Sequence, residues 1–305
     1  MTLRLRQIAA LLLTGLLAAP QAAEAGRLIL SRDFIERHKK LVTITVNFSI
    51  EKAHKSPNSP KKDGDLHMAG RSSQVGLPMV AEIMNAKTQP TALKFVKKHT
   101  DKPAVPLVGV WRLWFEHPPG GNGEQRQFDP VDRPKDPNPK HMFEIHPVTK
   151  IGEIEIQATF KPIEGYEAWD AQTAFKHYES RMAIIQPAGE AVVLISKRAL
   201  YNYAEFRIAL TKKPEHRDDG LAVMAIVKDV EGTTVVDKPR RMVFVAGTEP
   251  ANKVKNLKKG AELHVLGIPR VSLEGIAELA KVAGPHGKEF HLPYEMIIVA
   301  VIPEP

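Results

Sequence analysis

Acidic and histidine side chains gather in two short stretches of this sequence. The first reads Asp63-Gly64-Asp65-Leu66-His67 and the second Glu144-Ile145-His146-Pro147-Val148. In both, acids and histidines alternate with apolar residues, which is the period of a β-strand with its polar groups on one face. Two imidazoles and two or three carboxylates suit Zn²⁺ or Mn²⁺, and a carboxylate-rich subset suits Ca²⁺. Such an ion could polarise a phosphoryl oxygen or lower the pKa of a bound water.

The surrounding pattern predicts the elements that position these residues. Strands are predicted at 41–50, 66–69, 77–84, 105–115 and 141–156, with a helix at 88–98. Three strands, a helix and two further strands is the order of an OB-fold, a small five-stranded Greek-key barrel. We therefore predict a mainly-β protein whose N-terminal domain is an OB-fold-like barrel.

In an OB-fold the second and fifth strands both neighbour the third, about 4.8 Å away on either side. The five candidate metal or ligand contacts on one shared face are Asp65, His67, Glu82, Glu144 and His146. The same alternation is also typical of a solvated barrel face, and Asp-Gly-Asp is a common turn before a strand. Three interpretations therefore stand: a wet face, a non-catalytic ligand contact, or a metal or catalytic site.

Further ligand contacts are predicted on the fourth strand and in two loops. Trp111, Leu113 and Phe115 share one strand face and are expected in the core, which leaves Arg112 and Trp114 as surface groups. An exposed tryptophan beside a cation could stack on single-stranded nucleic acid. The loops 54–62 and 117–140 correspond to those that frame the binding face of an OB-fold.

The two acid–histidine motifs together resemble those of an uncharacterised group of secreted bacterial proteins. That group carries Asp-Gly-Asp-x-His early and Glu-x-His-Pro-Val at the end of a single OB-like domain, here about residues 40 to 156. The resemblance implies the fold and no established activity. More distantly, the Asp-Gly-Asp piece is similar to the start of a staphylococcal-nuclease-type OB-fold, in which carboxylates hold Ca²⁺ and arginines bind phosphate. Arg71 and Arg112 are the nearest arginines, and 85–87 lacks that family's acidic turn.

The remaining sequence divides into a predicted leader, a linker and a second domain. Arg4 and Arg6, an apolar run at 8–20 and Ala23-Glu24-Ala25 indicate a secretory signal peptide over residues 1–25. The OB-like domain is assigned to 26–156, a helical linker to 157–182, and a second mainly-β domain with helical additions to 183–305. That second domain could be another OB-like barrel. No later run is long and apolar enough for a membrane span.

Composition narrows the chemistry and the partners. The chain has no cysteine, so disulfides and thiol catalysis are excluded, and a metal would need histidine and carboxylate ligands. The formal charge of +8 becomes +7 once Arg4, Arg6 and Glu24 leave with the signal peptide. A basic chain favours anionic partners such as single-stranded nucleic acid or another anionic polymer.

These observations favour an exported, periplasmic or secreted, non-enzymatic binding protein that engages an anionic or extended ligand through its barrel face. No Ser-His-Asp set, Walker loop, Rossmann fingerprint or His-Glu-x-x-His helix is present, so enzymatic activity is disfavoured without being decided. The alternatives are a metal-dependent, nuclease-like phosphodiesterase and a structural or assembly partner in the envelope. No cofactor is predicted apart from a possible divalent metal, and the oligomeric state is left open.

Overall fold

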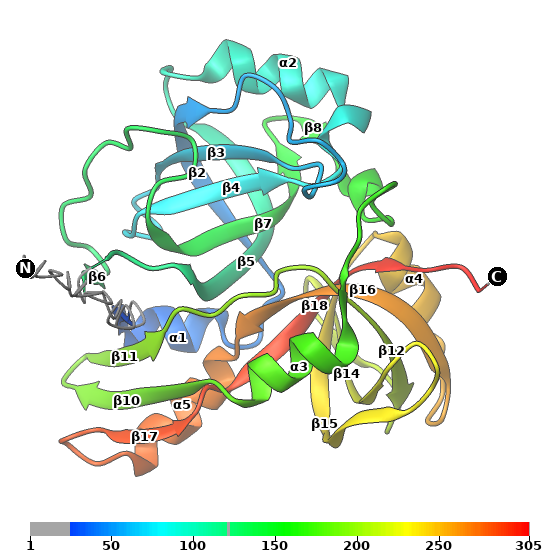
Figure 1. Cartoon of the computed structure of the whole chain (residues 1–305). Helices are drawn as coiled ribbons and strands as arrows, with labels where there is room; N and C mark the ends of the chain where they lie inside the picture. The colour runs from blue at the N-terminus through cyan, green and yellow to red at the C-terminus, as the bar shows by residue number, and fades with distance from the viewer. Residues whose placement is uncertain (1–24, 121–122, 305) are drawn as a thin grey trace, which may run out of the picture.

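Two closed five-stranded barrels and a third sheet make up the structure (Figure 1). The computed structural model of the chain describes residues 25–120 and 123–304. The predicted signal peptide lies outside these ranges except for its last residue, Ala25, which begins the first strand. The prediction of a mainly-β protein with an OB-like barrel is confirmed.

The first barrel follows the strand order of an OB-fold. Its strands are β2 (Thr43–Ala53), β3 (Leu66–Arg71), β4 (Met79–Ile83), β5 (Val105–His117) and β7 (His141–Ile151), with the short β8 (Ile154–Glu155) beside β7. The parallel pairing of β4 with β7 closes the barrel, and the other neighbours are antiparallel. A short turn η1 (Ala86–Thr88) and helix α2 (Pro90–His99) follow β4, and the fixed φ of Pro90 suits the first turn of that helix.

The second barrel repeats this topology. Its strands are β12 (Ala204–Leu210), β14 (Gly220–Lys228), β15 (Thr234–Val245), β16 (Glu262–Val271) and β18 (Tyr294–Val301). Again the third and fifth strands, β15 and β18, pair in parallel, and a helix, α4 (Glu249–Val254), follows the third. A further helix, α5 (Leu273–Val282), begins where Ser272 accepts a hydrogen bond from the Gly275 amide. The second domain is therefore another OB-like barrel.

The third sheet joins distant parts of the chain. Its order is β17 (Lys288–His291), β10 (Met182–Ala188), β11 (Ala191–Lys197), β1 (Ala25–Ser31) and β6 (Glu124–Arg126). The remaining elements are α1 (Arg32–His38), η2 (Gln157–Thr159), β9 (Trp169–Asp170), α3 (Ala171–Glu179) and β13 (Glu215–Arg217). Strand β6 lies within the predicted 117–140 loop. The domain limits at 156 and 182 stay a prediction.

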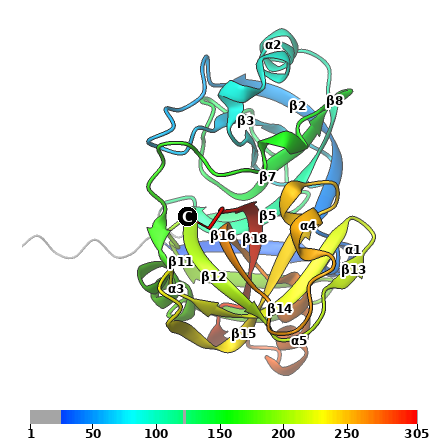
Figure 2. The same cartoon turned by 90° about the vertical axis from the view of Figure 1, so that its right-hand side faces the viewer.

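The barrels pack against each other through their outer faces (Figure 2). Each barrel has alternating inward and outward side chains, and here some outward residues are also apolar. The first barrel contributes Val42, Met84 and Val110, and the second contributes Val243, Val245, Leu266, Ile268, Ile297 and Val299. Polar residues on the first barrel's outer face are buried beside this apolar contact. Within the described residues, every helix is too short or too polar to cross a membrane.

Candidate functional site: a buried polar cluster and two cavities

The five predicted acid and histidine residues converge between the two barrels. We call this group, with three further residues, the interbarrel cluster: Asp65, His67, Glu82, Arg112, His141, Glu144, His146 and Tyr203. None of these side chains belongs to a residue more than 7% exposed. The OB-fold register explains the convergence. His67 pairs with Glu82 across β3 and β4. Val80 of β4 pairs with Glu144 of β7, so Glu82, two residues further along β4, lies beside His146.

His146 occupies the centre of the interbarrel cluster. Its Nε2 atom lies 2.8 Å from the hydroxyl of Tyr203 and 3.3 Å from Oδ2 of Asp65. The Tyr203 hydroxyl in turn donates a 2.8 Å hydrogen bond to that same Asp65 oxygen. On the other side of the ring, Nδ1 lies 3.3 Å from Oε2 of Glu82 and 3.6 Å from Oε2 of Glu144. One imidazole therefore faces three carboxylates.

Arg112 and His141 hold Glu144 at the other end of the cluster. The Arg112 guanidinium forms an ion pair with Glu144, contacts Glu116 at 3.1 Å and donates to the Pro269 carbonyl oxygen of the second barrel at 2.9 Å. His141 Nε2 lies 3.0 Å from Glu144 Oε1. These contacts neutralise Glu144 and tie it to both barrels.

Burial and charge pairing oppose each other throughout the cluster. Burial would raise the pKa of Glu82, but His67 and His146 outweigh it and lower the pKa to about 2. Burial would lower the pKa of His67, but Glu82 raises it to about 9. Asp65 behaves differently, because burial dominates over His146 and raises its pKa to about 6. The ionised groups of the cluster thus stabilise one another's charges, and one carboxyl group, that of Asp65, ionises less readily.

The fourth strand departs from the sequence prediction. Arg112 and Trp114 were predicted as surface groups, and this is wrong: they are 0% and 1% exposed. The reason is that the face opposite the barrel core is covered by the rest of the chain. Arg112 joins the cluster, whereas Trp114 packs edge-on against Tyr178, with ring centroids 5.8 Å apart. Arg71 lies outside the interbarrel cluster and forms an ion pair with Glu51 at 2.5 Å.

Sequence reasoning missed Tyr203, His141 and His54. His141 precedes Glu144 by three residues, a spacing that puts the two on opposite faces of a regular strand, and the irregular register between β5 and β7 at this end brings them together. Tyr203 lies next to the first strand of the second barrel, and no motif connects it with Asp65. His54, in the predicted binding loop, reaches His67 with 3.3 Å between their Nδ1 atoms.

A cavity of about 550 Å³ opens beside His54, between α2 and the 54–62 loop. Its wall contains Ala53, His54, Lys55, Pro57, Leu66, Leu93, Lys94, Val96, Lys97 and Thr100. We call it the lysine cavity, because Lys55, Lys94 and Lys97 are exposed and no acidic residue lines it. Among the described residues, no salt bridge involves these three lysines. The cavity therefore offers unpaired positive charge above an apolar floor.

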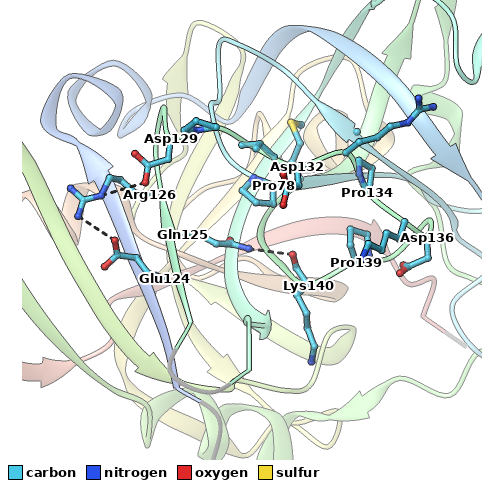
Figure 3. A pocket seen from close by; sticks show the side chains of 16 residues that line it. Pro78, Glu124, Gln125, Arg126, Asp129, Asp132, Pro134, Asp136, Pro139 and Lys140 are labelled. Carbon is cyan, nitrogen blue, oxygen red and sulfur yellow. Dashed lines mark hydrogen bonds and ion pairs between the residues drawn. The ribbon is translucent and has the colours of Figure 1, made fainter.

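A second cavity, of about 460 Å³, lies under the 117–140 loop (Figure 3). Its wall is fixed by internal contacts: Arg126 bridges Glu124 and Asp129 at 3.2 and 3.6 Å, and Gln125 donates to the Lys140 carbonyl oxygen. Four acidic and four basic residues line it. The charges there are balanced, which distinguishes it from the lysine cavity.

Comparisons with known proteins leave the family open. Neither a protein-family model nor a curated protein matches the sequence. One similar solved structure is described as "Structural mimicry for functional antagonism"; the match has 12% identity, covers 78% of this chain and 90% of that chain, and has a TM-score of 0.18. That TM-score does not place the two chains in one fold.

Proposed function

We propose that this protein is an exported binding protein that takes an amphiphilic anion, such as an alkyl carboxylate or alkyl phosphate, in the lysine cavity. The observation that carries the proposal is the rim of three lysines without an acidic partner over an apolar floor. The cavity's volume is in the range of small-molecule sites. The OB-like barrel supports a binding role, since this fold commonly binds ligands between its strand face and loops.

The cavity has a cationic part and an apolar part, so we expect its ligand to have an anionic group and an apolar chain. Lys55, Lys94 and Lys97 attract an anionic head group and would pair with it at the solvent boundary. Ala53, Pro57 and Leu93 are partly exposed and form apolar surface behind the lysines, and covering that surface with an alkyl chain is favourable because water is released. A purely ionic ligand would leave that apolar surface wet.

Because the strand face of the first barrel is buried, we place the ligand at the 54–62 loop and not on the strands. Asp65, Glu82, Glu144 and His146 are at most 5% exposed, so a polymer backbone cannot contact them in this arrangement. The same burial disfavours the nuclease-like alternative, because a phosphodiester could not reach these side chains. The 54–62 loop, predicted to frame the binding face, instead lines the lysine cavity.

Binding of dodecyl phosphate to the chain from residue 26 onward, measured by calorimetry, tests the proposal. The double variant Lys94→Glu/Lys97→Glu should bind at least about tenfold more weakly, because two attractions become repulsions. Lys212→Glu/Lys213→Glu is the matched control, since it makes the same charge change at exposed residues of the second barrel. Equal affinities for the two variants, or no binding by the unmodified chain, would overturn the proposal.

A further inference from the structure

The hydrogen bonds of Tyr203 define the proton arrangement on His146. The Tyr203 hydroxyl donates to Asp65 Oδ2, so its oxygen accepts from His146 Nε2, 2.8 Å away. A neutral His146 then carries its proton on Nε2 and presents a bare lone pair at Nδ1. That lone pair faces two carboxylates, which is repulsive unless a positive charge lies between them.

The geometry at Nδ1 is not that of a hydrogen bond. His146 is fully buried, and its Nδ1 has no hydrogen-bond partner although Glu82 Oε2 is 3.3 Å away. Charge-assisted N–H···O contacts are shorter, about 2.7–2.9 Å. By contrast, two ligands that each lie about 2.1 Å from a tetrahedral zinc are about 3.4 Å apart. Asp65 Oδ1 is a second buried atom without a partner.

Charge balance points the same way. The cluster contains three buried carboxylates, Asp65, Glu82 and Glu144, and one permanently charged cation, Arg112. A divalent ion would supply the positive charge that protonated His67 and His146 otherwise supply to these carboxylates, and it would leave the imidazoles free to act as ligands.

We propose that Asp65, Glu82 and His146 bind a divalent transition-metal ion, with Zn²⁺ as the first candidate. Each offers one ligand atom, and the three atoms lie within 4.8 Å of one another. Imidazole and carboxylate ligands suit zinc, and the Tyr203 hydroxyl orients the His146 ring through Nε2. Because Tyr203 belongs to the second barrel's entry segment, the ion would fasten the barrel interface.

A neighbouring set, Glu82, His141 and Glu144, meets the same distance limit but is a weaker candidate. Both nitrogens of His141 already have partners, Pro139 O at 2.7 Å and Glu144 at 3.0 Å. Glu144 is also neutralised by Arg112. The ion therefore belongs at His146 rather than at His141.

Two buried-histidine variants make a matched test. The chain from residue 26 onward would be loaded with Zn²⁺, passed through gel filtration and analysed for metal by mass spectrometry. The unmodified protein and His141→Gln should retain one ion per chain, whereas His146→Gln should lose it. Retention by His146→Gln, or loss by His141→Gln alone, would refute the assignment.

Thermal unfolding of the unmodified chain provides a readout that does not depend on whether a variant folds. After EDTA treatment, added Zn²⁺ should raise the Tm by several degrees, because the ion binds the folded state. The surface variant His216→Ala should show the same rise, since His216 is exposed on β13. A chain that retains no ion and whose Tm does not respond to Zn²⁺ or Mn²⁺ overturns the proposal. Dodecyl phosphate binding is measured separately, so the two proposals fail independently.

Discussion

The guanidinium of Arg270 stacks over the ring of Trp111, with 3.6 Å between the guanidinium carbon and the ring centroid. Arg270 lies on β16 of the second barrel and Trp111 on β5 of the first. The same guanidinium donates to the carbonyl oxygens of Val42 and Trp111, each at 3.0 Å, and pairs with Glu295 at 2.8 Å. A single buried cation thus connects strands of both barrels.

Replacing Arg270 with methionine should destabilise the protein by roughly 3–5 kcal/mol. The loss follows because Glu295 stays buried with only a longer 3.5 Å contact to Arg241, and carbonyl oxygens lose their donors. Urea unfolding followed by circular dichroism measures the change. Arg37→Met serves as the control, because its ion pair with Asp33 is exposed and should contribute at most about 1 kcal/mol. Equal effects would show that Arg270 does not hold the interface.

Tyr203→Phe should reduce stability by about 1–3 kcal/mol while the ring packing is kept. The substitution removes the hydroxyl that joins His146 to Asp65, so buried polar atoms lose a partner. Tyr166→Phe is a suitable comparison, since Tyr166 packs edge-on against Tyr203 with centroids 5.5 Å apart. Denaturant midpoints of the two variants should differ clearly; coincident midpoints would contradict the role given to the hydroxyl.

If the lysine cavity binds an amphiphilic anion, affinity should depend on alkyl length. Each buried methylene contributes about 0.8 kcal/mol, or roughly fourfold in Kd, until the apolar floor is filled. Calorimetry with a series of alkyl phosphates measures this dependence. Leu93→Ser should flatten the series, because Leu93 lines the floor. A Kd that does not change with alkyl length would show that only the lysines contribute to binding.

His177 should make the protein less stable in mild acid. Its Nε2 accepts a 3.0 Å hydrogen bond from the Leu200 amide, and burial, with a smaller effect of Arg181, lowers its pKa to about 4. The unfolded chain, with a pKa near 6.5, binds more protons between these values, so stability falls as the pH drops from about 6.5 towards 4. Tm differences between the unmodified chain and His177→Gln at about pH 7.5 and about pH 5 isolate this contribution. A difference that does not shrink at the lower pH would argue against it.

Much of the fold could be predicted because it depends on local pattern. The order of three strands, a helix and two strands fixed the first barrel's class, and the apolar alternation of residues such as Val46 and Phe48 identified its inner face. The convergence of the acid and histidine residues could also be anticipated, since OB-fold pairing brings β3, β4 and β7 together.

The sequence by itself determined the strand order, the shared face of Asp65, His67, Glu82, Glu144 and His146, and the absence of cysteine ligands. Only the tertiary structure decided that this face is buried and that Tyr203 and Arg112 complete it. The physical reason is that a strand's alternation separates two faces without stating what covers each. An outward face looks the same in sequence whether water or a second barrel lies against it, and that contact depends on residues more than a hundred positions away.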